Sequence, residues 1–207
     1  MTKDEELQLY KSDPGLLYNN RFFRRHARAR GLNMAAAKAL YDKFHPSSVL
    51  DVGCGIGGYL EGFLACGVKE IHGVEYMLDH AKPYISPLVL PFVVKEDASV
   101  FCRWPMVDLV MSIEVAEHIL PERSEVFAAN LAAASKKWIV MTAATPTQRG
   151  TGHFNGRHQE YWIDLMDLNS FDYRGRLTRR MGRVLKAVGR YGWLKDNLMI
   201  FEKEDVG

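Results

Sequence analysis

The sequence predicts an α/β protein built on a doubly wound, mostly parallel β-sheet with helices on both faces. Two observations lead to this fold class. Between residues 49 and 142, short apolar runs typical of buried strands alternate with segments of helical periodicity. The first apolar run leads directly into a glycine-rich turn, which is typical of open α/β sheets that bind a ligand at the carboxyl ends of their strands.

The expected elements follow one another in a regular order. Residues of about 1–45 form a helical extension, with a helix over 34–41. Strands are expected over 49–52, 71–75, 90–95, 107–113 and 138–142, with helices between them over 58–65, 77–85 and 122–134. Past residue 142 the alternation stops. There we expect a polar loop over 144–160, a helix over 161–168, a short strand over 171–173, a basic helix over about 174–190 and a final strand over 197–202.

Length and composition indicate an ordinary globular protein. The 207 residues are enough to bury a sizeable core, and we expect 1–207 to form one domain. The net charge of +2 points to no class of partner, and three cysteines form neither a disulfide framework nor a zinc pattern. The first ten residues lack the apolar core of a signal peptide, and no apolar run reaches the roughly 20 residues of a membrane span. We therefore expect a cytoplasmic protein without a membrane span.

The turn after the first strand has the sequence Asp51-Val-Gly-Cys-Gly-Ile-Gly57. Its glycines fit both the dinucleotide fingerprint and the pattern of S-adenosylmethionine (SAM) sites. In a dinucleotide site the turn receives a pyrophosphate, which a carboxylate at the end of the strand would repel. SAM has no phosphate but carries an ammonium and a sulfonium group. Asp51 can therefore accept a hydrogen bond from the ammonium, or hold the loop in place. The charge argument therefore favours SAM.

Two further carboxylates end the next two expected strands. Glu75 lies 18 residues past Gly57, where a carboxylate can accept both ribose hydroxyls, and Asp97 can accept from the adenine amino group. Carboxyl ends of parallel strands share one edge of a sheet, so Asp51, Glu75 and Asp97 are expected together. The complete set predicted to bind the cofactor is Asp51, Gly53, Cys54, Gly55, Gly57, Glu75, Tyr76, Asp97, Ala98, Ser112, Ile113 and Glu114.

At these residues the chain resembles the Rossmann-like (class I) SAM-dependent methyltransferase superfamily. The resemblance runs from about Val49 to Thr142, and its motifs are Val49-Leu-Asp-Val-Gly-Cys-Gly-Ile-Gly57, Gly73-Val-Glu75, Glu96-Asp97-Ala98 and Asp108-Leu-Val-Met-Ser-Ile-Glu-Val-Ala-Glu-His118. It implies a seven-stranded sheet in the order 3-2-1-4-5-7-6 with the last strand antiparallel. It also implies an enzyme that converts SAM to S-adenosylhomocysteine.

The segment Glu114-Val-Ala-Glu-His118 carries the first candidate catalytic groups. We expect it to begin a helix on which Glu114, Glu117 and His118 share one face. In one interpretation the segment lines the cofactor site, as in the small-molecule O- and N-methyltransferases that it resembles. Glu117 and His118 then only cap the helix or pack against neighbouring residues. In a second, His118 or Glu117 is a general base, because a poised imidazole can remove the acceptor's proton at neutral pH.

A third interpretation of this segment is a divalent-metal site. Glu114, Glu117 and His118 would bind the ion together with His158 or His153 from the later loop. The segment resembles that of small-RNA 3′-terminal 2′-O-methyltransferases, which have Glu-x-x-Glu-His followed by a later histidine. The motif that leads into the later histidine is poorly matched here.

The loop over 150–162 carries further candidates. It resembles a segment of many bacterial and phage methyltransferases, in which a Gly-His-x-Asn loop leads into a Glu-Tyr-Trp helix. His153 and Asn155 are therefore candidates to hold or deprotonate the acceptor. The structural alternative is that the segment only begins a helix, with Trp162 packed on the sheet.

Two basic segments, over 21–30 and 174–195, contain no acidic residue. They are either solvated faces or an attraction for a phosphate-bearing acceptor, including nucleic acid. The function expected is methyl transfer from SAM to oxygen or nitrogen of a polar small-molecule or glycan-like acceptor. RNA methylation, for example at a ribose 2′-oxygen and assisted by a divalent metal, is one alternative. A non-catalytic partner subunit with the SAM fold is the other.

Overall fold

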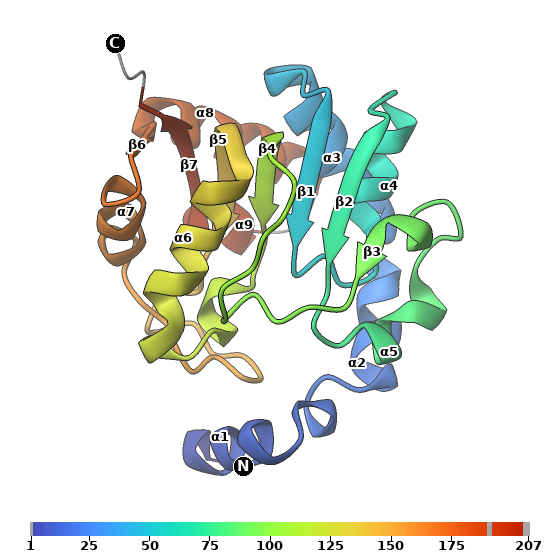
Figure 1. Ribbon diagram of the computed structural model, residues 1–207, viewed down its shortest axis with the longest axis vertical. Coiled ribbons are helices and arrows are strands. Elements are labelled where there is room, and N and C mark those ends of the chain that lie inside the picture. The colour runs from blue at the N-terminus through green and yellow to red at the C-terminus, as the bar shows by residue number, and fades with distance from the viewer. Residues whose placement is uncertain (1, 190–191, 205–207) are drawn as a thin grey trace.

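The computed structural model describes residues 2–189 and 192–204. Its strands form one seven-stranded sheet in the order β3-β2-β1-β4-β5-β7-β6 (Figure 1). Strands β1 to β5 pair in parallel, whereas β7 is antiparallel to both β5 and β6. The strand order and the antiparallel last strand confirm what the resemblance implied.

From β1 onwards the strands and helices follow one another in the predicted order, except that α9 was not predicted. The strands are Ser48–Val52 (β1), Glu70–Val74 (β2), Val93–Val94 (β3), Val107–Ser112 (β4), Ser135–Thr142 (β5), Phe171–Tyr173 (β6) and Leu198–Lys203 (β7). The α-helices are Lys3–Ser12 (α1), Asn20–His26 (α2), Arg30–Phe44 (α3), Gly58–Ala65 (α4), Leu78–Ala81 (α5), Ser124–Ala134 (α6), Gln159–Asp167 (α7), Gly175–Val188 (α8) and Gly192–Asn197 (α9).

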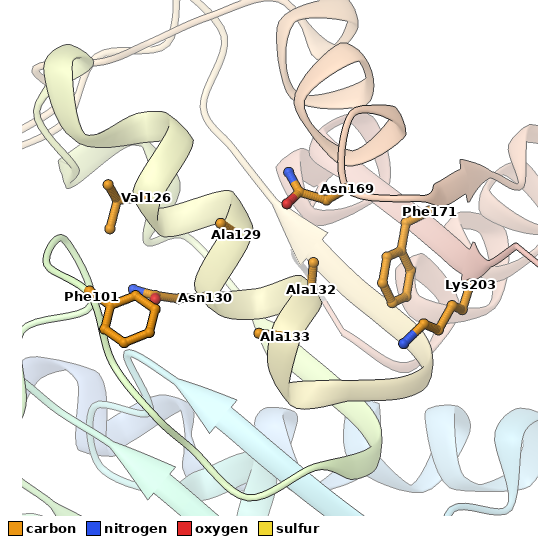
Figure 2. Close-up of a pocket in the computed structure, with 9 residues that line it drawn as sticks. All are labelled: Phe101, Val126, Ala129, Asn130, Ala132, Ala133, Asn169, Phe171 and Lys203. Atoms are coloured by element: carbon orange, nitrogen blue, oxygen red, sulfur yellow. The ribbon is translucent and has the colours of Figure 1, made fainter.

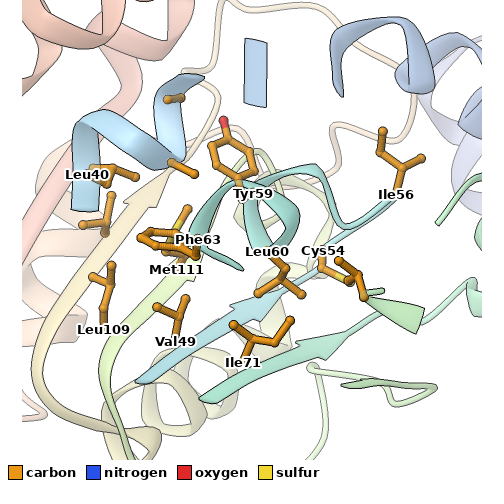
Figure 3. Close-up of a cluster of buried hydrophobic side chains, with 14 of the residues drawn as sticks. Leu40, Val49, Cys54, Ile56, Tyr59, Leu60, Phe63, Ile71, Leu109 and Met111 are labelled. Carbon is orange, nitrogen blue, oxygen red and sulfur yellow. The ribbon is translucent and has the colours of Figure 1, made fainter. Parts of the chain in front are cut away.

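The sheet has an apolar core on each face. On one face α3, α4 and α8 cover the sheet, and Figure 3 shows Leu40 and Phe63 from these helices beside Val49 and Leu109 of the central strands. On the other face α6 and α7 pack side chains such as Phe127 against the strands. Both layers are required because the strands in the middle of a parallel sheet are apolar on their two sides.

Prolines shorten two of the expected elements. The strand expected over 90–95 consists only of Val93–Val94, because Leu90–Phe92 forms a 3₁₀ turn that contains Pro91. The helix expected over 77–85 stops at Ala81 and continues as a 3₁₀ turn over Lys82–Tyr84, which contains Pro83. Proline lacks the backbone N–H that a strand ladder or a helix interior requires.

The segment before β1 and the basic segment after β6 are helical, as expected. The extension before β1 consists of α1, α2 and α3 with short 3₁₀ turns between them. The basic helix is α8, which ends at Val188; Arg190 of the predicted helix lies outside the described residues. Within 2–189 and 192–204, every helix is too short or too polar to cross a bilayer.

Candidate active site

The glycine turn joins β1 to α4 in a left-handed backbone conformation. Gly53, Gly55 and Gly57 have φ angles of 74°, 56° and 69°, which other residues adopt only at a cost. A Cβ atom on Gly53 would lie 2.4 Å from a methyl carbon of Val115, so the turn also passes too close to its neighbour for a side chain. The backbone amide of Gly53 donates to the Val74 carbonyl at 2.8 Å, which fixes the turn beside the end of β2.

Two buried carboxyl groups meet beside this turn. Asp51, at the end of β1, has an oxygen, Oδ2, without a hydrogen-bond partner among the described residues. Burial, and after it the negative charge of Glu75, raises the pKa of Asp51 to about 7. Glu75 accepts from the backbone amides of Gly55 at 2.9 Å and Met77 at 2.8 Å. Together the two acids make a buried, electronegative site that suits a cationic ligand.

Two other residues that were predicted to bind the cofactor, Asp97 and Ser112, make hydrogen bonds with a structural role. The Asp97 carboxylate accepts from the amide of Ser99 at 2.8 Å and turns the chain there. Ser112 is fully buried, and its hydroxyl donates to the Val52 carbonyl at 3.0 Å. That hydroxyl therefore joins β4 to β1. Cys54 is also buried, and burial raises the pKa of its thiol well above the usual value.

The segment 114–118 is not the α-helix that we expected. Only Ala116–His118 forms a turn, of the 3₁₀ type, and Glu114 has a φ of 56°. The Glu114 amide donates to the Thr142 hydroxyl at 2.7 Å, which holds this left-handed bend at the end of β4. The predicted common helix face of Glu114, Glu117 and His118 is therefore wrong, since a bend precedes the turn.

Three side chains nevertheless converge at this turn. Candidate ligand atoms of Glu117, His118 and His153, which we call the Glu–His–His cluster, all lie within 4.8 Å of one another. Glu117 is fully buried, and neither of its carboxyl oxygens has a hydrogen-bond partner in the described part of the chain. His153 Nε2 lies 4.0 Å from its Oε1, and the Glu114 carboxyl group is close enough to interact with it. Burial, and after it the charge of Glu114, raises the pKa of Glu117 well above its usual value.

Backbone carbonyls orient both histidine rings of the cluster. His153 Nδ1 lies 3.2 Å from the Gln148 carbonyl oxygen, and His118 Nδ1 lies 2.9 Å from that of Gly152. Because a carbonyl can only accept, the neutral rings carry their proton on Nδ1 and leave a lone pair on Nε2. Burial lowers the pKa of His118 to about 4, so this ring is neutral at pH 7.

The N-terminal extension completes the site, which the sequence did not predict. Figure 1 shows α1 beyond the carboxyl ends of the strands. The Tyr18 hydroxyl lies 2.9 Å from His118 Nδ1, and the Glu6 carboxylate accepts from the Gly152 amide at 3.1 Å. No sequence pattern reveals these contacts, because the partners are 100 and 146 residues apart.

Tyr10 of α1 connects this extension to the cofactor side. Its ring packs against Phe154 with the centroids 5.1 Å apart. Burial, and after it the charge of Asp97 and the nearby Tyr76, raises the pKa of Tyr10 to about 12. The phenol of Tyr10 is therefore close to the residues that were predicted to bind adenine. The extension thus contacts the Glu–His–His cluster and lies near residues that were predicted to bind the cofactor.

Two residues of the segment 150–162, Asn155 and Trp162, are buried inside the protein. Asn155 is buried and bonded on both sides, since its amide donates to the Ser124 hydroxyl at 2.8 Å and its carbonyl oxygen accepts from Arg157 at 3.0 Å. It is therefore not free to hold an acceptor, contrary to one interpretation of the loop. Trp162 is fully buried, which confirms its packing role.

His158 lies outside the Glu–His–His cluster. It is exposed at the start of α7, where it is the N-cap residue. Among the described residues, the ligand atoms of Glu114 and His158 belong to no candidate metal group with Glu117 and His118. The third interpretation, a metal site, is therefore wrong in these two members; of the two loop histidines that it offered, His153 is the one beside Glu117 and His118.

The basic residues of the two basic segments are mostly solvated. On α8 the exposed ones are Arg176, Arg179, Arg180, Arg183 and Lys186, and in the first segment they are Arg21, Arg24, Arg25 and Arg28. Arg30 is different, because it bonds to the Glu61 carboxylate at 3.1 Å and to the Tyr84 carbonyl. The buried side of α8 consists of Thr178, Met181, Gly182 and Leu185.

A groove of about 480 Å³ lies elsewhere, between α6 and the β6 edge of the sheet (Figure 2). Phe101, Asn130, Phe171 and Lys203 are among its lining residues, and most of the lining is apolar. It contains none of the residues predicted to bind the cofactor or the acceptor.

Comparison with known proteins agrees with this geometry. The model of a family described as a methyltransferase domain matches residues 20–183. The chain belongs to this family. The match confirms the prediction of a SAM-dependent methyltransferase. No curated protein matches the sequence.

Solved methyltransferase structures share the fold at low sequence identity. DesVI of Streptomyces venezuelae superposes with a TM-score of 0.62 at 17% identity, over 93% of this chain and 99% of that one. A SAM-dependent methyltransferase from Archaeoglobus fulgidus gives 0.57 at 20%, over 88% and 99%. The 1,6-didemethyltoxoflavin-N1-methyltransferase of Burkholderia thailandensis, solved with its acceptor and S-adenosylhomocysteine, gives 0.58 at 14%, over 98% and 87%.

Proposed function

We propose that this methyltransferase acts on oxygen or nitrogen of a polar small-molecule or glycan-like acceptor. The observation that carries the proposal is the hydrogen bond between the Tyr18 hydroxyl and His118 Nδ1, which brings the N-terminal extension against the Glu–His–His cluster. Burial raises the pKa of this phenol, and so do the charges of Glu117 and Glu75. We infer that the donor and the acceptor bind in one space at the strand ends, with Asp51 and Glu75 on one side of it and the Glu–His–His cluster on the other.

The residues at the first side of this space fit SAM. The unpartnered oxygen of Asp51 is a ready acceptor for the ammonium, and the glycine turn allows close approach of the ligand. Glu75 already accepts two amide hydrogens, and its carboxylate retains lone pairs for ribose hydroxyls. When bound, SAM supplies an electrophilic methyl group. Asp51, Glu75 and the turn hold the donor in place.

The residues at the second side of the space engage the acceptor. Methyl transfer depends mainly on the alignment of the nucleophile with the methyl group and the sulfur. Tyr18 and the loop around Gly152 provide walls that position the acceptor, and both contact His118. The acceptor atom loses a proton during transfer, and Glu117, His118 and His153 are the groups beside it that can favour this loss.

The small-molecule class is supported by the crowded site and by structural likeness. The rings of Tyr18 and Phe154 pack against Tyr10 with centroids 6.4 Å and 5.1 Å away, which crowds the site proposed for the acceptor. A single small acceptor fits such a site better than a folded polymer. The similar Burkholderia thailandensis structure is an N1-methyltransferase with its small-molecule acceptor bound.

The test has two parts. Calorimetry should show binding of SAM and S-adenosylhomocysteine to wild type and at least ~10-fold weaker binding to Glu75→Gln. Formation of S-adenosylhomocysteine should then be measured with a panel of hydroxylated, amino and glycosylated small molecules. The proposal fails if SAM binds but only a polymer is methylated.

RNA remains a second candidate because of the exposed arginines on α8 and in the 21–30 segment. Such a substrate would bind with an affinity that falls steeply as salt rises, since phosphate contacts release counterions. Methylation of short RNAs that is lost on replacement of Arg179 and Arg183 by glutamine would favour RNA. Equal activity of that variant on small molecules would favour our first proposal.

A further inference from the structure

We infer that the Glu–His–His cluster binds a divalent transition-metal ion through one carboxyl oxygen of Glu117 and one ring nitrogen each of His118 and His153. The ion belongs to the first-row class that accepts mixed nitrogen and oxygen ligands, such as Zn²⁺, Mn²⁺ or Fe²⁺. The inference goes beyond methyl transfer itself, which needs no metal.

The first support is the geometry of the three donors. Their ligand atoms lie within 4.8 Å of one another, and Glu117 Oε1 is 4.0 Å from His153 Nε2. Two atoms bound to one ion at about 2.1 Å each are at most about 4.2 Å apart. A small inward movement of the side chains therefore suffices, and no backbone rearrangement is needed.

The second support is the orientation of the two rings. Metal-binding histidines almost always donate their other ring N–H to a carbonyl, a carboxylate or water. Both rings have this arrangement, because each Nδ1 faces a backbone carbonyl, that of Gln148 for His153 and that of Gly152 for His118. The carbonyls thus fix the tautomer in which Nε2 is free to bind an ion.

The third support is the unpaired carboxyl group. Glu117 has no exposed surface, and both of its oxygens are without a partner among the described residues. Leaving a buried polar group unpaired is costly, and the usual partners of a buried carboxylate are a cation or a metal. The structure provides no lysine or arginine ion pair for Glu117 within its described residues. An ion between Glu117 and the two rings would satisfy it.

The donor set selects the kind of ion. Two imidazoles and one carboxylate suit zinc, iron or manganese, whereas magnesium and calcium prefer oxygen ligands alone. Three protein ligands also leave at least one position open, as in catalytic metal sites. A second acidic group, formed by Asp167, Asp172 and Glu204, is largely exposed and has only carboxylates. It has neither a histidine nor a buried unpaired oxygen, and we assign no ion to it.

The consequence for the reaction rests on the proposed function. A divalent ion in this cluster would withdraw electron density from an acceptor oxygen or nitrogen and lower its pKa. The acceptor would then lose its proton near neutral pH, as methyl transfer to that atom requires. Under this inference Glu117, His118 and His153 act as ligands, and the proton leaves to solvent.

The experiment uses the full chain without a histidine tag, freed of metal by a chelator. Zn²⁺ is titrated by calorimetry, and Co²⁺ is followed by its visible absorption, which distinguishes nitrogen and oxygen ligands from cysteine thiolates. We expect one ion per chain, with affinity at least ~10-fold weaker in Glu117→Gln and in His153→Gln. The matched control is His158→Gln, which removes a nearby histidine outside the cluster and should bind as wild type does.

The outcomes separate the metal from the methyl transfer. SAM affinity and far-ultraviolet dichroism should be unchanged in the variants, which shows that they fold. The inference is overturned if wild type binds no ion, or if Glu117→Gln and His153→Gln bind as tightly as wild type. Full methylation in chelator would then leave the proposed function intact with a histidine as the base. Metal binding through the cluster without methylation of any acceptor would instead reject the function and keep the site.

Discussion

The hydroxyl of Tyr18 lies 2.9 Å from Nδ1 of His118, and this contact joins the N-terminal extension to the turn after β4. The two residues are 100 positions apart in the chain. The same ring nitrogen also faces the Gly152 carbonyl, so that three separate segments meet at His118. The orientation of this ring therefore depends on parts of the chain that contribute nothing to each other's secondary structure.

Removal of the Tyr18 hydroxyl should impair the acceptor side alone. Tyr18→Phe loses one hydrogen bond worth about 1 kcal/mol, which corresponds to a fall of roughly fivefold in kcat/KM. SAM affinity should stay within about twofold, because the donor side is separate. Steady-state kinetics and calorimetry measure the two effects. Tyr41→Phe on α3 is the control; an equal loss in that variant would contradict the argument.

SAM binding should strengthen as pH rises from 5.5 to 7. The pKa of Asp51 is raised to about 7 in the folded protein, so the carboxyl is largely protonated below that pH. A cation binds the ionised form, and affinity should rise about tenfold per pH unit until the group is ionised. Calorimetry in buffers of different ionisation enthalpy should detect the released proton. In Asp51→Asn, binding should be weaker and lose most of this pH dependence.

The raised pKa of Asp51 also makes the ligand-free protein less stable as pH rises. The folded-state pKa of Asp51 is higher than the unfolded one, so the unfolded chain releases a proton that the folded protein keeps between about pH 4 and 7. This residue therefore lowers stability progressively across that window. Thermal melts should show that Asp51→Asn gains in stability relative to wild type as pH rises from 4 to 7. A difference that does not change with pH would refute this.

A methyl group at Gly152 should damage the site without unfolding the protein. Its φ is 71°, and a Cβ atom there would lie 1.9 Å from the Tyr18 hydroxyl. Gly152→Ala should therefore displace Tyr18 and lower kcat/KM at least ~10-fold, while SAM still binds. The matched control is Gly67→Ala, since Gly67 has a φ of 94° but nothing within 4 Å of its Cβ position. Both variants carry backbone strain of about 1 kcal/mol, and only the first should lose activity.

The contact between α3 and α4 should tolerate no side chain at Gly62. A Cβ atom there would lie 2.6 Å from that of Ala37 and 2.8 Å from the Met34 Cα. Gly62→Ala should lower the free energy of unfolding by about 1–3 kcal/mol, measured by denaturant titration. Gly31→Ala, in the same helix as Ala37 and with nothing within 4 Å, should instead be neutral or stabilising by up to about 1 kcal/mol.

The sheet and the strand ends that carry the predicted cofactor residues were predictable because local signals specify them. Apolar runs gave the strands, and Asp51, Glu75 and Asp97 each follow a strand, so the geometry of a parallel sheet alone places them together. The superfamily pattern then supplied the strand order. These features depend on neighbours in sequence or on a repeated topology.

The acceptor side could not be predicted in the same way. The bend at Glu114 depends on a hydrogen bond to Thr142, which is 28 residues away, and it removed the expected helix face. The choice of His153 over His158 depends on how the loop folds against Glu117. Tyr18 carries no motif at all. Contacts of this kind arise from tertiary packing and leave no periodicity in the sequence.

The division of the site between sheet and extension bears on how such an enzyme can change over evolution. The residues predicted to hold the donor lie at strand ends and in the turn between β1 and α4, which belong to the sheet layer itself. Helix α1 has no buried residue, and its contacts with the loop around Gly152 are those of Glu6 and Tyr10. Substitutions at exposed positions of α1 can therefore change the shape presented to an acceptor without altering the sheet. New acceptors can be acquired through this helix while the methyl donor stays the same.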